Sequence, residues 1–118
     1  MAKSIEIVRI DRDSVGNEYI LLLVNEDVNL KGYAIVDKTF DSEGVESDIF
    51  RHIYFFRSLL VQKGDYVALW TKKGTYFKNK TTDNSPLHNL YWGSNENVWN
   101  NSGDTATLIK YAVIDQHS

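Results

Sequence analysis

Short stretches of alternating apolar and polar residues recur along this chain of 118 residues, and no window keeps the period of an α-helix. The alternation predicts strands at 4–10, 18–24, 28–36, 49–56, 65–71 and 105–114. A period of two is typical of β-strands, because successive side chains point to opposite faces of a sheet. Turn residues separate these strands at intervals of about 8 to 12 residues, which favours an all-β sandwich or barrel.

Three irregularities refine the predicted strands. The alternation within 4–10 shifts phase at Val8, which predicts a β-bulge there. Residues 18–24 are apolar on both faces, as expected of a central, well-covered strand. Gly32 interrupts the pattern of 28–36 and indicates a bend or the close packing of a large neighbour.

A turn-rich segment near the end of the chain lies between two tryptophans, Trp92 and Trp99. Asparagine and glycine favour turns, and the large rings supply buried area. This combination predicts a turn that is pinned to the core and braces it, with Gly103 and the neighbouring asparagines at positive φ. The aromatic-flanked stretch as a whole covers 87–108.

Length and composition set the class of protein. A single domain over residues 1–118, with its core at about 4–114, is expected for this length. A hydrophobic content of 42% and a charged content of 25% are ordinary for a soluble globular domain. The longest apolar run, 19–24, is too short to span a bilayer, so no membrane partner is expected.

Charge and cysteine content exclude several functions. The net charge of −3 argues against a dedicated nucleic-acid binder, which is usually basic. The chain has no cysteine, which excludes disulfides, thiolate catalysis and cysteine-based zinc sites. The start of the chain lacks the apolar region of a signal peptide, so a complete chain is expected in the cytoplasm. If the chain is a piece of a longer protein, its compartment stays open.

Four segments of the chain resemble the lamin tail domain family in sequence and in order. They are 16–20 (GNEYI), 28–33 (VNLKGY), 60–71 (LVQKGDYVALWT) and 90–108 (LYWGSNENVWNNSGDTATL). The resemblance spans about 5–114, and its last segment follows the order and spacing of the family's bacterial members. It implies an immunoglobulin-like β-sandwich of two antiparallel sheets that acts as a non-catalytic interaction module. It transfers no catalytic motif, although some nuclear members are associated with DNA or chromatin.

The chain departs from the family pattern at its edges. The turn after Val24 is shorter than usual, and the acidic segment 37–48 resembles an insertion or a longer hairpin. The last strand runs from Thr107 to Ile114 without the family's usual hairpin turn. These departures concern the edges of the predicted sandwich.

The candidate interaction surface lies in residues 72–86, which are predicted to form a long polar loop. It consists of Lys72, Lys73, Tyr76, Phe77, Lys78 and Lys80. Lysines with interleaved aromatic rings bind single-stranded nucleic acid through phosphate contacts and stacking. Lysines on a surface loop are also common without any ligand. We expect the loop to contact a protein partner, with nucleic-acid binding as the alternative.

A carbohydrate-binding platform is a further alternative, and it would need exposed, coplanar aromatic rings. The candidates for it are Trp70, Tyr91, Trp92 and Trp99. Because aromatic rings dominate sandwich cores, Trp92 and Trp99 are expected in the core instead.

The segment 37–48 holds five acidic residues and one lysine, a net charge of −4, and is expected to be a loop or hairpin tip. Four of these acids, Asp41, Glu43, Glu46 and Asp48, are candidates for calcium ligands by type but lack the ordered spacing of a calcium loop, so the segment is predicted to be a solvated tip. The opposite charge of 72–86 also allows copies of the chain to associate head to tail. Such a contact would weaken with salt.

Two histidines away from the end of the chain, His52 and His88, are candidates for catalytic groups. A hydrolase needs a nucleophile, a base and an orienting group within hydrogen-bond reach. Ser58, Ser85 and Ser102 lie in no nucleophile-elbow context, and the histidines lack the paired spacing of a metal site. The sequence therefore predicts structural histidines, no enzyme, no metal and no cofactor.

Overall fold

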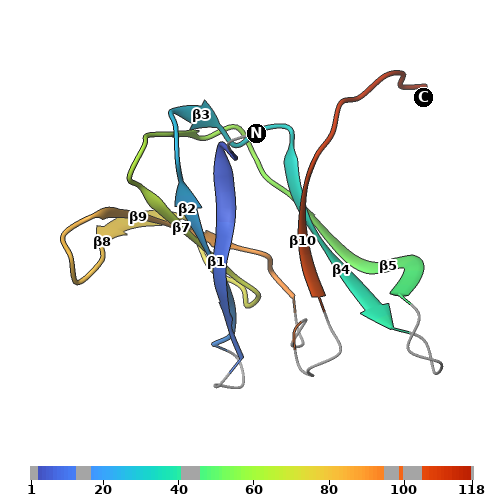
Figure 1. Ribbon diagram of the computed structural model, residues 1–118, viewed down its shortest axis with the longest axis horizontal. Coiled ribbons are helices and arrows are strands. Elements are labelled where there is room, and N and C mark those ends of the chain that lie inside the picture. The colour runs from blue at the N-terminus through green and yellow to red at the C-terminus, as the bar shows by residue number, and fades with distance from the viewer. Residues whose placement is uncertain (1–2, 13–16, 41–45, 95–98, 100–104, 118) are drawn as a thin grey trace.

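The computed structural model describes residues 3–12, 17–40, 46–94, 99 and 105–117, and the side chains of all of these except 38–40 and 46–51. Every regular element of this part of the chain is a β-strand (Figure 1). The strands are β1 (Ile5–Asp11), β2 (Tyr19–Val24), β3 (Val28–Asn29), β4 (Tyr33–Phe40), β5 (Glu46–Phe55), β6 (Leu60–Val61), β7 (Tyr66–Trp70), β8 (Phe77–Lys80), β9 (Pro86–Tyr91) and β10 (Thr105–Lys110).

Two sheets pack face to face as an immunoglobulin-like sandwich, which confirms the predicted fold class (Figure 1). The larger sheet has the order β1-β2-β7-β9-β8, and the smaller has the order β10-β4-β5. A third, two-stranded sheet joins β3 and β6. One pair differs from the antiparallel arrangement that the sequence predicted: β7 and β9 run parallel, with Trp70 opposite Tyr91.

The predicted bulge in the first strand is confirmed. The β1–β2 register shifts between Ile7 and Arg9, so Val8 is the extra residue, and its side chain is 49% exposed. The bulge keeps Ile5 buried near one end of the strand and Ile10 packed against the core at the other. The phase shift in the sequence is therefore the signature of a real kink.

The central position of β2 is also confirmed, because β1 and β7 pair on its two sides. Ile20, Leu22 and Val24 are buried between the sheets, whereas Leu21 and Leu23 on the opposite face are half-buried. The core therefore accounts for the apolar residues on the inner face of β2 but not for those on its outer face. The outer face of this strand is not fully covered.

The continuous strand predicted at 28–36 is wrong, because Gly32 turns the chain there. Gly32 has a φ of 97°, in the region that favours glycine, and the amide of Tyr33 donates to the carbonyl of Leu30. The residues before the turn form β3, and those after it form β4 in another sheet. The bend that Gly32 indicated is therefore also the point where the chain changes sheets.

The last predicted strand is shorter than expected. β10 ends at Lys110, which lies opposite Tyr33, the first residue of β4. The amide of Tyr111 still donates to the carbonyl of Gly32 at 2.8 Å, but the turn at Gly32 then leads the partner chain away, and a strand needs a partner for its backbone groups. Residues 111–117 therefore continue without strand structure.

The aromatic brace near the end of the chain is confirmed. Trp99 is fully buried, and its ring meets that of Trp92 edge to face at a centroid distance of 6.0 Å. The backbone amide of Trp99 donates to Oε1 of Glu18 at 3.1 Å, which ties it to the start of β2. Gly93 has a φ of 83°, whereas the expected turn residues at 95–98 and 100–104, including Gly103, lie outside the described residues.

The acidic segment joins β4 and β5, which form the predicted long hairpin, paired as far as Phe40 opposite Glu46. The tip, at 41–45, and the side chains of Glu46 and Asp48 lie outside the described part of the structure. The solvated tip and the charge pairing between copies therefore stay predictions for this segment. Among the described residues, no cluster of three metal-ligating side chains is present.

Candidate functional site

The candidate surface is not a single loop, as the sequence predicted, but a connection followed by an edge strand. Residues 71–76 leave β7, β8 follows, and a turn at 81–85 leads into β9. In that turn the amide of Thr81 donates to the carbonyl of Ser85, and Asn84 has a φ of 67°. Asparagine tolerates this left-handed conformation, so the polar TTDNS sequence closes a β8–β9 hairpin.

β8 is the outermost strand of the larger sheet (Figure 1). All four of its residues are exposed, and the Phe77 side chain is 47% exposed. Because side chains alternate along a strand, Lys78 and Lys80 share one side, and Phe77 and Asn79 share the other. An edge strand also presents backbone donors and acceptors along its unpaired side.

Asn89 fastens β8 to the sheet from its buried position on β9. Its Nδ2 donates to the Asn79 Oδ1 at 2.8 Å and to the carbonyl of Phe77 at 3.3 Å. Its Oδ1 accepts a hydrogen bond from Nε1 of Trp70 at 3.0 Å. One 2% exposed amide therefore connects three strands and fixes the position of the edge.

Tyr76 anchors the connection that enters β8. The Tyr76 hydroxyl lies 2.9 Å from Nδ1 of His88, and the two rings are nearly parallel. Nε2 of His88 lies 2.8 Å from Oδ2 of Asp65, so Nε2 donates to this carboxylate, and in the neutral ring Nδ1 accepts from the Tyr76 hydroxyl. The Arg57 guanidinium covers the Tyr76 ring at 4.5 Å from its centroid.

The same connection is seated on Tyr91. A Cβ added at Gly74 would lie 2.4 Å from Cδ1 of the Tyr91 ring, so the backbone and the ring are in direct contact. No side chain larger than hydrogen fits at this point without moving the ring. Gly74 therefore allows the close approach, and Tyr91 is used for packing rather than as part of a platform.

Lys72 lies apart from β8, in a row that has a cation at each end and two aromatic rings between them. Its Nζ is 5.0 Å from the centroid of Trp70 and donates to Asn17 Oδ1 at 2.9 Å. The Trp70 ring meets Tyr19 at 4.6 Å, and the Tyr19 hydroxyl accepts from Arg9 at 2.9 Å. That hydrogen bond raises the pKa of Arg9.

The carbohydrate platform is not assembled by the predicted tryptophans. Trp99 is buried, Trp92 packs against Trp99 and Tyr54, and the ring of Trp70 is tilted by 41° from that of Tyr19. A stacking platform needs exposed, coplanar rings. Of the two rings in the candidate surface, Tyr76 is half-buried and Phe77 is exposed.

His52 and His88 each contact an aspartate. Nδ1 of His52 lies 2.9 Å from Oδ2 of Asp37, whose Oδ1 accepts from the His52 amide at 2.7 Å. His88 is 3% exposed and lies between Asp65 and Tyr76, so a substrate in solvent does not reach it. The sequence could not reveal these partners, because Asp65 and His88 are 23 residues apart.

The surface differs from the predicted one in composition. The structure brings Phe77, Lys78 and Lys80 together on β8, whereas Lys72 contacts Trp70 and Tyr76 is anchored by His88. Lys73 is exposed in the connection between them. The sequence did not predict β8, β9 or the supporting role of Asn89, and the polar FKNK segment of β8 has no apolar–polar alternation that would have marked a strand.

Comparisons with known proteins agree with this architecture. The family model of the Lamin Tail Domain matches residues 2–118. No curated protein matches the chain. In the described part of the structure no helix has the length and apolar character needed to cross a membrane. Because the family match covers nearly the whole sequence, the chain belongs to the lamin tail domain family, a family of non-enzymatic, immunoglobulin-like interaction domains.

Proposed function

We propose that this domain is a non-catalytic interaction module whose β8 edge binds an extended segment of a protein partner. The observation that carries the proposal is the position of β8 at the edge of the larger sheet with all four residues exposed. An extended peptide that pairs with such an edge gains backbone hydrogen bonds, and side chains on alternate positions supply specificity.

The side chains of β8 define the chemistry of the segment. Lys78 and Lys80 favour acidic residues on one side of the added strand, and Lys73 extends the positive charge into the connection. Phe77 offers an apolar ring on the other side. The expected partner segment is therefore an extended stretch with acidic residues on one face and an apolar residue on the other.

The support beneath β8 lowers the entropic cost of binding. Asn89 holds the strand from the sheet side, and the Tyr76–His88–Asp65 chain holds the connection before it. A surface that is already ordered loses little conformational freedom when a partner binds. This rigid edge is the physical basis for a binding role.

Affinity capture from native lysate tests the proposal. The wild type is compared with Lys78→Glu/Lys80→Glu and with the matched control Lys31→Glu/Lys63→Glu, which reverses two exposed lysines outside β8. We expect one partner to be captured by the wild type and by the control but lost from the β8 variant. Equal capture by all three proteins would contradict a role for β8.

A second candidate function, single-stranded nucleic-acid binding, is favoured by the row formed by Arg9, Tyr19, Trp70 and Lys72. Cations beside rings contact phosphates and stacked bases. Fluorescence anisotropy with single-stranded DNA would then show a linear fall of log affinity with log salt, and Lys72→Ala would reduce that slope by about 1. Absence of binding at low salt removes this candidate.

A further inference from the structure

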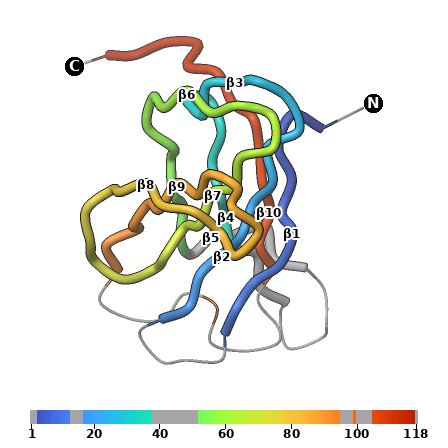
Figure 2. The backbone as a smooth tube through the Cα atoms, turned by 90° about the vertical axis from the view of Figure 1, so that its left-hand side faces the viewer, coloured from blue at the N-terminus to red at the C-terminus, as the bar shows by residue number. Residues whose placement is uncertain are grey.

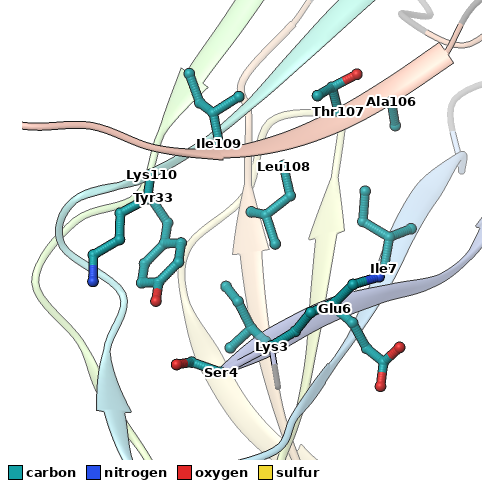
Figure 3. A pocket seen from close by; sticks show the side chains of 11 residues that line it. Lys3, Ser4, Glu6, Ile7, Tyr33, Ala106, Thr107, Leu108, Ile109 and Lys110 are labelled. Atoms are coloured by element: carbon teal, nitrogen blue, oxygen red, sulfur yellow. The ribbon is translucent and has the colours of Figure 1, made fainter. Parts of the chain in front are cut away.

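A groove separates the two sheets where their edge strands β1 and β10 face each other (Figure 3). Its volume is about 560 Å³, within the range of sites that enclose ligands. Leu108 extends from β10 toward β1, while Thr107 and Ile109 point to the opposite side of their strand (Figure 3). The floor of the groove is therefore apolar, and each wall is a strand edge.

Both walls have backbone groups available for pairing. β1 pairs only with β2, and β10 pairs only with β4, as far as the described strands show. Such edges bind extended chains readily. Two edges that face one groove make this the place where the sandwich could accept one more strand.

The segment 111–117 has the complementary character. Its residues Tyr111, Ala112, Val113 and Ile114 continue the β-forming sequence of β10, but the segment forms no strand within the chain. The Ile114 side chain is 97% exposed, and that of Val113 is 62% exposed. An apolar, β-branched sequence left in solvent gains stability when it pairs with an edge and buries these side chains.

The segment is directed away from the groove of its own chain. The amide of Tyr111 donates to the carbonyl of Gly32 at 2.8 Å, and the Tyr111 ring meets Phe55 at 5.2 Å. Both contacts lie on the β4–β5 side of β10, whereas the groove lies on its β1 side. Figure 2 shows the end of the chain running on from β10 past β3, to the side opposite the N-terminus. Folding back would need a tight turn, and Tyr111–Ile114 contain no glycine, asparagine or proline to form one.

The charges at the groove fit the segment as well. Lys3 and Lys110 line it, and Asp115 follows directly after the exposed Ile114. Glu6 also lines the groove, but its Oε1 already accepts from Asn25 Nδ2 at 3.1 Å. An inserted segment with one aspartate therefore meets lysines that can pair with it.

We propose that the groove between β1 and β10 binds the 111–117 segment of a second copy of this chain as an added strand. Ile114 fills the space above Leu108, and Asp115 reaches Lys3 or Lys110. The contact joins two different surfaces of the protein, so it produces either a reciprocal dimer or a head-to-tail chain of copies. It is independent of β8, which lies at the opposite edge of the larger sheet.

Sedimentation of the full chain over a range of concentrations tests the contact. We expect the wild type to associate. We expect Ile114→Asp to raise the dissociation constant about tenfold or more, because it places a charge where the contact between copies would bury an isoleucine. Leu60→Asp is the matched control, since Leu60 is 77% exposed on β6, outside both the groove and the segment. It should leave association unchanged, as should Lys78→Glu/Lys80→Glu.

A peptide with the sequence YAVIDQH locates the contact on the full-length Ile114→Asp variant. We expect it to shift the NMR amide signals of Ile5–Ile7 and Ala106–Lys110, and we expect the peptide YAVDDQH to shift them far less. A monomeric wild type, equal weakening by Leu60→Asp, no binding of either peptide, or shifts confined to other strands would each overturn the proposal.

Discussion

The hydroxyl of Tyr76 and Nδ1 of His88 lie 2.9 Å apart, and this hydrogen bond links the connection before β8 to a buried side chain of β9. His88 in turn contacts Asp65 at the start of β7. The imidazole of His88 therefore links two other positions, Asp65 and Tyr76, through its two ring nitrogens. The exposed edge of the sheet depends on this buried polar chain for its position.

Replacing Tyr76 with phenylalanine should lower the free energy of unfolding by about 1–2 kcal/mol. The change removes the donor to Nδ1 of His88 and leaves a buried acceptor unsatisfied. Urea unfolding measures the loss. Tyr66→Phe is the control, because no partner of the Tyr66 hydroxyl is seen among the described residues. It should change stability by less than about 0.5 kcal/mol, and equal effects of the two substitutions would contradict the role of the hydrogen bond.

Replacing Gly74 with alanine should destabilise the domain by about 1–3 kcal/mol, because the new methyl group overlaps the Tyr91 ring. Thermal unfolding of Gly74→Ala, Tyr91→Ala and the double variant measures the coupling. The double variant should be more stable than the sum of the single effects predicts, since the smaller residue at 91 makes room for the methyl group. Additive effects would show that the contact is not tight.

Replacing Trp99 with alanine should cost about 3–5 kcal/mol, a large share of the stability of a small domain. The side chain is fully buried and packs against Trp92. Trp99→Phe should cost less because it keeps a ring in the same space. Leu60→Ala, at a 77% exposed position, is the control and should have little effect on the urea midpoint. A loss below about 1 kcal/mol for Trp99→Ala would rule out the brace.

Stability should fall as the pH rises above about 10, and Tyr54 should contribute to the fall. Burial raises the pKa of the Tyr54 hydroxyl, against an opposing effect of Arg57. The unfolded chain therefore releases this proton at a lower pH than the folded protein, and the folded state loses its advantage as the pH rises between the two pKa values. Urea unfolding from neutral to alkaline pH should show a shallower decline for Tyr54→Phe. An identical decline for both proteins would contradict the prediction.

Sequence reasoning identified the sandwich because most strands have one buried face, and that face imposes the period of two. It located the bulge at Val8 because an extra residue in the strand shifts the phase of that period. It missed β8 because an edge strand that is exposed on both sides needs no apolar face, and FKNK has a polar composition typical of a loop. It placed the end of β10 too late because the end depends on where β4 begins, which is not encoded in β10.

The candidate site was predictable in its location but not in its support. The density of lysines and rings between Lys72 and Lys80 marked the region. The roles of Asn89, His88 and Asp65 come from the parallel register of β7 and β9, which places distant residues next to each other. Local patterns carry no information about such a register, so this part required the structure.

The placement of β9 between β7 and β8 has a consequence for the order of folding. β8 precedes β9 in the chain but reaches the sheet only through it, so β8 joins the sheet either after β9 or together with it as a β8–β9 hairpin. The β8–β9 hairpin closes through the short turn at 81–85. The parallel pairing of β9 with β7 needs a longer crossover, so we expect it to form more slowly than the hairpin. Until the hairpin docks, β7 is itself an open edge during refolding, and that interval is when two unfinished chains are most able to exchange hairpins.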